Sequence, residues 1–264
     1  MSFDPISTIR PYALSAITFA YTKLNFAKYP QTGLRVLMYH AIGTSIENDT
    51  RSLYNMTPKQ FKKHMRHLVE YYKNYLVPFN SSALEGNSLK IALTFDDGYR
   101  DNLTVVAPIL AELGIPFTIF ICTGAVAESR TGFLTPEDVR ELAALQGAKI
   151  GSHTISHSRL TECDDSQLKE ELIGSKNYLE DLIGSEVNML SYPHGAVNNR
   201  VRDFVEMAGY QIGATSRFDL NEFGRDPLLL CRTDIWAQDN LSIFEQKLQG
   251  NWDWNRWRSI DLTK

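Results

Sequence analysis

Short apolar runs alternate with amphipathic stretches along most of this chain, and the alternation predicts a succession of β-strands and α-helices. Mostly apolar runs predict strands over residues 34–40, 75–79, 91–95, 117–122, 149–152, 187–192, 210–215 and 228–235. Apolar positions three and four residues apart predict helices that start at Thr57 and then span residues 103–113, 135–145, 166–183, 199–208 and 241–248. Strands that alternate with helices are typical of α/β folds with a largely parallel sheet.

Two adjacent carboxylates end the strand predicted over residues 91–95. Asp96 and Asp97 are like charges close together, an arrangement that raises the pKa of one carboxyl unless a cation lies beside the pair. Downstream, His153 and His157 offer two imidazoles four residues apart. One aspartate and two histidines are a ligand set for a catalytic metal, and the second aspartate is then left free as a base. The sequence therefore indicates metal-assisted hydrolysis.

These motifs resemble those of a known family. Thr-Phe-Asp-Asp-Gly (residues 94–98) followed by His-Thr-Ile-Ser-His (residues 153–157) is similar to the paired motifs of the NodB-homology polysaccharide deacetylases, the fourth carbohydrate esterase family. The resemblance implies three metal ligands, Asp97, His153 and His157, and a general base, Asp96. It implies one divalent metal ion, zinc before cobalt, nickel or iron. The expected reaction removes acetyl groups from an N-acetylated or O-acetylated sugar, polysaccharide or glycan precursor.

The resemblance also implies a fold and a division of the chain. The family's fold is an irregular (β/α) barrel with fewer than the full eight strands, and the similarity covers residues 34–250. We therefore predict a single barrel domain over these residues, an N-terminal helical extension over residues 1–33 and a Trp-rich C-terminal tail over residues 251–264. In such a barrel the active site lies at the C-terminal ends of the strands, where both motifs are predicted to lie.

The chain departs from the family pattern in its C-terminal part. Most members carry a late Leu-x-His motif whose histidine serves as the acid, and none of the six histidines here follows His194. Tyr39-His40, at the end of the first predicted strand, resembles the branch of the family with a circularly shifted motif order. Since the first and last strands of a closed barrel are neighbours, we predict that His40 is the acid. A buried structural histidine is the alternative.

A third motif is also altered. Ser-Tyr-Pro-His-Gly (residues 191–195) resembles the family's Arg-x-Pro-Tyr-Gly, with Ser191 at the arginine position and His194 at the tyrosine position. The resemblance implies substrate or oxyanion contacts by Tyr192, Pro193 and His194, the last through its backbone N–H. The usual arginine holds the base. Arg232, in a later predicted strand, is the candidate to replace it, and a surface position is the alternative.

Two other functions fit parts of the pattern. A non-catalytic carbohydrate-binding relative would fit the missing arginine and the missing late histidine, and it would bind sugar without releasing acetate. Two histidines and one carboxylate also serve non-haem iron oxygenases. Those enzymes commonly carry His-x-Asp on one strand, which this chain lacks, and they have no use for Asp96.

Two further groups of residues are interpreted as structural. His64 and His67 lie on the helix that starts at Thr57, among lysines and an arginine, and are assigned to a solvated basic face. The tryptophans of the tail are assigned to packing of a terminal segment, with a sugar-stacking platform as the alternative.

Composition and charge limit the partners and the compartment. A net charge of −4 without a basic stripe argues against nucleic acid as a partner. Three cysteines without a metal-type spacing argue against a disulfide framework and favour a reducing compartment. The apolar run over residues 12–21 is shorter than the ~20 residues that span a bilayer, and Asp4 is unusual in a secretion leader. We expect a cytoplasmic protein, with export as the alternative. Its apolar positions between residues 6 and 24 either pack on the domain or make peripheral membrane contact.

Overall fold

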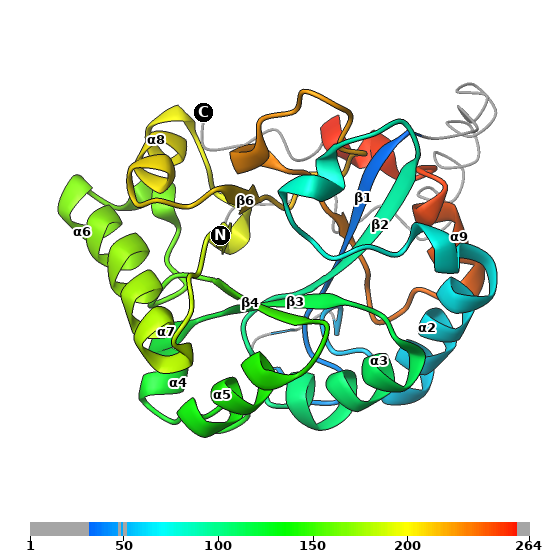
Figure 1. Cartoon of the computed structure of the whole chain (residues 1–264), viewed down its shortest axis with the longest axis horizontal. Coiled ribbons are helices and arrows are strands. Elements are labelled where there is room, and N and C mark those ends of the chain that lie inside the picture. Colours follow the sequence, from blue (N-terminus) through cyan, green and yellow to red (C-terminus); the bar gives the residue numbers. More distant parts are fainter. Residues whose placement is uncertain (1–31, 47–48, 50–51, 258–264) are drawn as a thin grey trace.

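A curled parallel sheet wrapped by helices makes up the computed structural model, which describes residues 32–46, 49 and 52–257 (Figure 1). Within those residues the sheet has seven strands in the order β6-β5-β4-β3-β2-β1-β7, and each pair of neighbours is parallel. The strands are β1 (Gly33–Tyr39), β2 (Leu89–Phe95), β3 (Phe117–Ile121), β4 (Ala148–Ser152), β5 (Met189–Ser191), β6 (Ile212–Ala214) and β7 (Thr233–Asp234). The predicted fold class, an irregular (β/α) barrel in one α/β domain, is confirmed.

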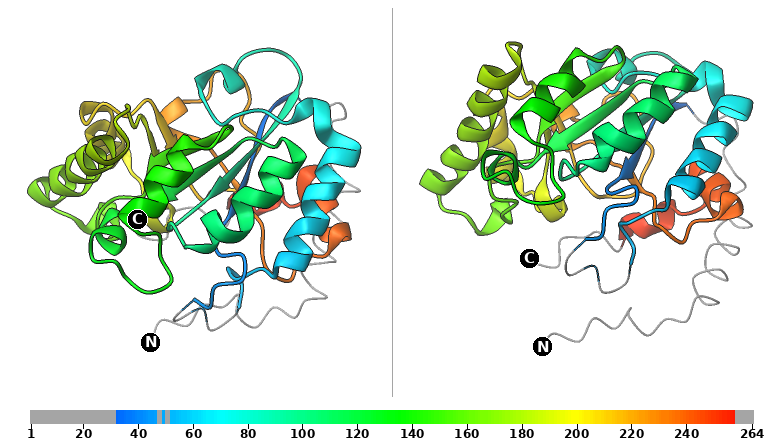
Figure 2. Two further views of the ribbon diagram at one scale, coloured as in Figure 1. Left: turned by 60° about the horizontal axis from the view of Figure 1, so that its bottom comes forward. Right: turned by 90° about the horizontal axis from the view of Figure 1, so that it is seen from below.

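Helices cover the outer face of this sheet (Figures 1 and 2). They are α2 (Pro58–Tyr72), α3 (Ala107–Leu113), α4 (Thr123–Ala127), α5 (Pro136–Ala144), α6 (Asp165–Lys169), α7 (Ser175–Ile183), α8 (Asn199–Met207) and α9 (Leu241–Leu248). One π-helical turn, Asn102–Val106, precedes α3, and a second, Glu170–Gly174, joins α6 to α7. The π-helical turn before α3 has a local cause. Pro108 has no N–H to donate to the preceding turn, so the pattern of helical hydrogen bonds is irregular there.

Capping residues explain where several helices begin and end. Thr57 accepts a hydrogen bond from the backbone N–H of Gln60 at the start of α2, and Pro58 occupies the first turn. Thr135 and Asp138 form a reciprocal capping box at the start of α5. Gly114 ends α3 in the left-handed region at φ 67°, a conformation that costs glycine little. These ends agree with the sequence prediction because each depends on residues that are neighbours along the chain.

Two apolar layers hold the strands in place. The larger layer lies between the sheet and the helices, and β1 and β2 contribute Leu37, Ile91 and Leu93 to it. The smaller layer includes Val36 and Ala92 from the alternate positions of the same two strands. Because successive side chains of a strand point to opposite faces, this smaller layer fills the inside of the curled sheet.

A single extended segment closes the barrel. Leu230 pairs with Ala214 at the end of β6, and Thr233 pairs with Leu37 of β1 a few residues later. The strand predicted over residues 228–235 is therefore divided: a 3₁₀ turn, Pro227–Leu229, comes first, and only Thr233–Asp234 qualify as a strand. The segment changes its pairing partner partway along, and so it cannot form one uniform ladder.

The strand predicted over residues 75–79 is wrong. The segment makes one bridge, Leu76 to Ile91, and Val77 donates to the carbonyl of Ile91. Pro78 then has no N–H for a further ladder bond, and Phe79 turns inward to pack in the interior layer. This segment therefore serves to fill the barrel.

The assignment of His64 to a solvated face is also wrong. Its side chain is fully buried and stacks on Phe244 of α9, with 4.1 Å between ring centroids. Its Nε2 lies 2.8 Å from the carbonyl oxygen of Asp239. His67, half-buried on the same helix, lies 2.6 Å from Glu245.

The described part of the C-terminal tail packs on the domain. Trp252 and Trp254 are buried and contact Trp236 and Phe218 in a small aromatic cluster. The N-terminal extension predicted over residues 1–33 lies outside the described residues except at its end, as do residues 258–264. In the described part of the chain, no helix combines the length and apolar character needed to cross a membrane.

Candidate active site

Strand alternation gathers polar side chains at one end of the barrel. His40 continues the inward positions of β1, and Asp96 continues those of β2, at the C-terminal ends of these strands. Ser191, the last residue of β5, and Arg232, just before β7, follow the inward positions of their own segments. The C-terminal ends of parallel strands meet at the same rim, and so these four residues are brought together.

The turn after β2 aims Asp97 at the two histidines. Asp97 has φ 75°, in the left-handed region that aspartate tolerates better than most residues, and Gly98 follows with φ 80°. Because the backbone turns here, the side chain of Asp97 does not follow the alternation of inward and outward positions along β2. Its Oδ1 lies 3.4 Å from Nε2 of His153 and 3.4 Å from Nε2 of His157.

These three residues fit a metal ion. Their ligand atoms all lie within 4.8 Å of one another. A tetrahedral ion with bonds of about 2.0–2.1 Å places its ligand atoms roughly 3.3–3.4 Å apart. Both distances from Asp97 Oδ1 match that edge, so the described residues form a candidate metal site.

His153 is held by a second contact on its far side. Its Nδ1 lies 2.8 Å from the carbonyl oxygen of Ser191, which makes Nδ1 the donor and leaves Nε2 free to bind a metal. Burial lowers the pKa of His153, but the charges of Asp96 and Asp97 outweigh burial and raise it. His157 is more exposed, and burial together with the charge of His153 lowers its pKa to about 4.

Asp96 does not belong to the ligand triad and is held by a buried arginine. Arg232 donates to both carboxylate oxygens, each at 2.7 Å, and the hydroxyl of Ser191 donates to Oδ2 at 3.0 Å. Burial raises the pKa of Asp96, but the Arg232 guanidinium outweighs burial and lowers it. The carboxylate is thus kept ionised and fixed in direction, as a base requires.

Arg232 and Ser191 make the contacts to Asp96 that the resemblance assigns to the arginine missing from the third motif. Arg232 also donates to Ser191 Oγ at 2.7 Å, so the serine links the guanidinium and the carboxylate. The sequence pointed to Arg232 only by its predicted position at a strand end. It contained no signal for the Ser191 contact.

His40 lies at the same rim, near enough to Asp96 and Asp97 for its charge to act on both carboxylates. Its ring contacts Tyr54, with 4.5 Å between centroids, and its buried Nδ1 has no hydrogen-bond partner among the described residues. Its charge acts to lower the pKa of Asp96 and Asp97. It also partly offsets the effect of burial, which raises the pKa of Asp234.

Two acidic residues near His40 were not predicted. Asp234 ends β7, and its buried Oδ1 has no hydrogen-bond partner among the described residues. Asp101 accepts the backbone N–H groups of Ile42 and Thr44, both at 2.8 Å, and so fixes the loop that follows His40. No sequence pattern relates either residue to His40.

The third-motif residues separate in space. The side chain of Tyr192 is buried under α8, and its hydroxyl donates to the carbonyl of Leu228 at 2.8 Å. Its backbone N–H donates to Ala214, so Tyr192 offers neither group to a substrate, contrary to the sequence prediction. The cause is strand alternation, because Ser191 faces inward and its neighbour must face outward.

Of the next two residues, His194 lies beside a metal ligand. Pro193 is buried, whereas His194 is exposed and has φ 57°. The His194 ring contacts that of His157, with 4.5 Å between centroids. Burial, followed by the charge of Arg159, lowers the pKa of His194.

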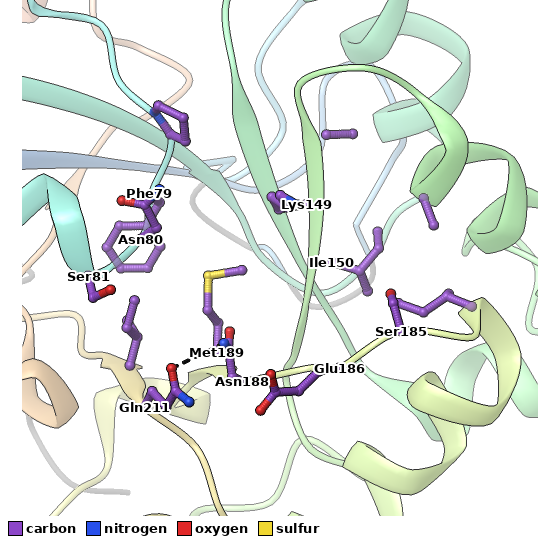
Figure 3. A pocket seen from close by; sticks show the side chains of 15 residues that line it. Phe79, Asn80, Ser81, Lys149, Ile150, Ser185, Glu186, Asn188, Met189 and Gln211 are labelled. Carbon is purple, nitrogen blue, oxygen red and sulfur yellow. Dashed lines mark hydrogen bonds between the residues drawn. The ribbon is translucent and has the colours of Figure 1, made fainter.

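A cavity of about 320 Å³ opens at the opposite end of the barrel (Figure 3). It is lined by the starts of β4, β5 and β6, and its polar groups are mainly amides and hydroxyls. Asn188 donates to Gln211 across it at 3.2 Å. It lacks the clustered acids and histidines of the metal end, and we place the candidate active site at the metal end.

Comparison with known proteins places this geometry in a family. A profile described as polysaccharide deacetylase matches residues 84–213, which include both metal motifs. The Bacillus subtilis protein YxkH, whose name assigns it to the same family, is 31% identical over 188 residues, 69% of this chain and 64% of its own length. The chain belongs to the polysaccharide deacetylase family. A chitooligosaccharide deacetylase from Rhizobium leguminosarum is 34% identical over 97 residues, 36% of this chain and 41% of its own length. The chain therefore spans less than two thirds of the length of these curated relatives.

A solved deacetylase structure shares the barrel. The deacetylase PplD of Streptococcus pyogenes aligns with a TM-score of 0.71 and 22% identity, over 83% of this chain and 99% of that one. At this identity the likeness concerns the fold, which agrees with the seven-stranded barrel described above.

Proposed function

We propose that this chain is a metal-dependent hydrolase that removes acetyl groups from an N-acetylated amino sugar within a glycan. The main support for the proposal is that the two adjacent aspartates have different surroundings. Asp97 faces two histidines at metal-ligand distances, while Asp96 is fixed by Arg232 beside them. Relatives named for chitooligosaccharide and peptidoglycan N-acetylglucosamine support the substrate class. O-acetyl groups are a second substrate for the same chemistry.

Asp97, His153 and His157 would hold the metal, for which we propose zinc. A bound divalent cation would lower the pKa of a coordinated water and polarise the acetyl carbonyl. Asp96 would accept the proton of the attacking water. Arg232 and Ser191 occupy one side of the Asp96 carboxylate, and its Oδ2 lies 3.9 Å from Nε2 of the proposed ligand His153.

His40 would donate a proton to the leaving nitrogen. An amine is a poor leaving group, and so amide cleavage needs an acid opposite the base. His40 lies at the same rim as Asp96, and Asp234 beside it offers a carboxylate to a protonated imidazole. The backbone at His194 would help to stabilise the oxyanion. An iron oxygenase would have no use for the fixed carboxylate of Asp96.

The test is acetate release from N-acetylated oligosaccharides, with the metal content of the same sample measured by elemental analysis. Wild-type protein should carry about one divalent metal ion per chain, as expected for a site with three protein ligands. Asp97→Ala should remove tight metal binding together with activity. Asp96→Asn should keep the metal and lose about 10²–10⁴-fold in rate, the usual contribution of a general base.

Asp181→Asn, on the exposed face of α7, is the matched control and should retain both metal and rate. Metal-loaded wild-type protein that binds the oligosaccharides but releases no acetate would favour the non-catalytic relative. An Asp96→Asn variant that is as active as wild type would remove Asp96 from the role of base.

A further inference from the structure

The loop that carries both histidine ligands has a strained backbone. Thr154 and His157 adopt φ values of 67° and 59°, in the left-handed region that non-glycine residues avoid. The conformation is costly for any residue with a Cβ, and a β-branched threonine is especially disfavoured there. A loop of this kind keeps its shape only when contacts from outside the loop hold it.

One side of the loop is held by the start of α4. The backbone N–H of Thr123 donates to the carbonyl of Thr154 at 3.0 Å, and that of Gly124 donates to the carbonyl of Ile155 at 2.9 Å. Gly124 permits this approach, because a Cβ there would lie 2.7 Å from the oxygen of Ile155. These bonds satisfy the carbonyls of the loop.

The other side is held by one carboxylate, that of Glu171. Its Oε2 accepts the backbone N–H groups of Ile155 at 2.8 Å and Ser156 at 3.0 Å, and its Oε1 accepts the hydroxyl of Ser156 at 2.5 Å. Ile155 is thus bonded on both sides, through its carbonyl to Gly124 and through its N–H to Glu171. Ser156, the last residue that this carboxylate binds, directly precedes His157.

The π-helical turn between α6 and α7 brings Glu171 to the loop. Ser175 donates to the backbone carbonyl of Glu171 at 2.6 Å, and Ser152 of β4 donates to Ser175 at 2.8 Å. Gly174 lies so close that a Cβ there would be 2.8 Å from Ile155 Cδ1. Single π turns inside helices often occur at functional sites, and this one fixes the distance between helix and loop.

We propose that Glu171 is a positioning residue for the metal site, which acts by holding the backbone before His157. The inference rests on the metal site proposed above. His153 has its own support from Ser191, whereas His157 is about one third exposed and depends on the loop for its direction. Among the described residues, no hydrogen bond or ion pair joins Glu171 to the side chains of Asp97, His153 or His157, and its effect passes through the peptides of Ile155 and Ser156.

The chain offers variants that separate hydrogen bonding from charge. Glu171→Gln removes the charge but can place its carbonyl oxygen where Oε2 now accepts both N–H groups. Ser156 can then direct its hydroxyl to Ser158 Oγ, 2.6 Å away. Glu171→Asp keeps the charge but withdraws the carboxylate by about one C–C bond, ~1.5 Å. Glu170→Gln, exposed in the same turn, is the matched control.

The experiment measures the Zn²⁺ dissociation constant of the full chain by competition with a chromophoric chelator, after removal of any bound metal. The unfolding midpoint of the metal-free protein is measured beside it. Glu171→Asp and Glu171→Ala should bind Zn²⁺ about 10–100-fold more weakly, as for other outer partners of metal-binding histidines. Glu171→Gln and Glu170→Gln should stay within about threefold of wild type, because the acceptor geometry is kept.

Co²⁺ loaded into the same variants reports the ligand field directly. Its visible spectrum should change in Glu171→Asp and stay unchanged in Glu171→Gln. If Glu171→Gln weakens Zn²⁺ binding as much as Glu171→Asp or more, the effect is one of charge and the positioning role is overturned. Wild-type affinity in both Glu171→Asp and Glu171→Ala also overturns it. If Glu171→Ala does not fold, Glu171→Asp decides alone. A wild-type protein that binds no metal would refute the metal site itself, and this outcome is recognised before any variant is compared.

Discussion

Replacing Arg232 by methionine should be among the most destabilising single changes in the barrel. The guanidinium is fully buried, the side chain of Asp96 is 4% exposed, and two bonds of 2.7 Å join them. Removing one partner of such a pair leaves a buried charge without compensation, at a cost of about 3–5 kcal/mol. Methionine keeps most of the side-chain length over the Phe120 ring, so the cost reports the ion pair more than a cavity.

The assay is urea denaturation of the metal-free protein at neutral pH, for Arg232→Met, Asp96→Asn and the double variant. Asp96→Asn should also be destabilised, because Arg232 then lacks its anion. The double variant should be less destabilised than the sum of the two by about 0.5–3 kcal/mol, the range for residues in direct contact. Arg140→Met, which breaks an exposed pair with Glu137, is the control and should cost about 0–1 kcal/mol.

The difference in unfolding free energy between wild type and Arg232→Met should depend on pH, and the direction of that dependence can be derived. The folded-state pKa of Asp96 is lowered in wild type, so the pair contributes stability above the unfolded carboxyl pKa of about 3.9 and loses it as pH falls further. In Arg232→Met, burial should raise that pKa, opposed only by the charges of His153 and His40. The destabilisation should then be full at neutral pH and shrink as pH falls through the raised pKa. A cost below about 1 kcal/mol at pH 7, or a strictly additive double variant, would refute the reasoning.

Two further outcomes are expected. His40→Ala should lose far more rate on N-acetyl amides than on activated aryl acetates, whose leaving group needs no proton, and equal losses would leave His40 structural. If the N-terminal segment contacts membranes, sedimentation with anionic liposomes should depend on Ile9, Ile17 and Leu24, whereas equal sedimentation of a variant lacking residues 1–28 would favour packing on the domain.

The parts of the fold that depend on neighbouring residues could be predicted from the sequence. Thr57 and Thr135 mark helix starts through bonds to residues three positions on, and Gly114 marks a helix end through its own backbone. The aspartates and the first histidine directly follow apolar strands, and a parallel sheet brings such strand ends to one rim. Local chemistry and strand direction were therefore enough to group the metal-site residues.

Contacts between distant residues could not be predicted in the same way. His64 is buried by Phe244 and Asp239, which lie in a different part of the chain, so its helix position alone suggested a solvated face. The hydrogen bond from Ser191 to Asp96 joins two strand ends with no pattern in common. Glu171 reaches the histidine loop only because a π turn brings it there, and no pattern in the sequence predicted that turn.

The closure of the barrel by Thr233 and Asp234 also bears on how the chain folds. These residues pair with β1, so the first and last described strands are neighbours, and such distant pairings make folding slow. During synthesis one edge of β1 stays open until β7 has emerged, and an open strand edge is a place where other chains can pair. Arg232 directly precedes Thr233, so it too is synthesised only near the end of the chain. A chain cut before it should carry both aspartates and both histidines, yet it would have an unfinished sheet and a base with no partner.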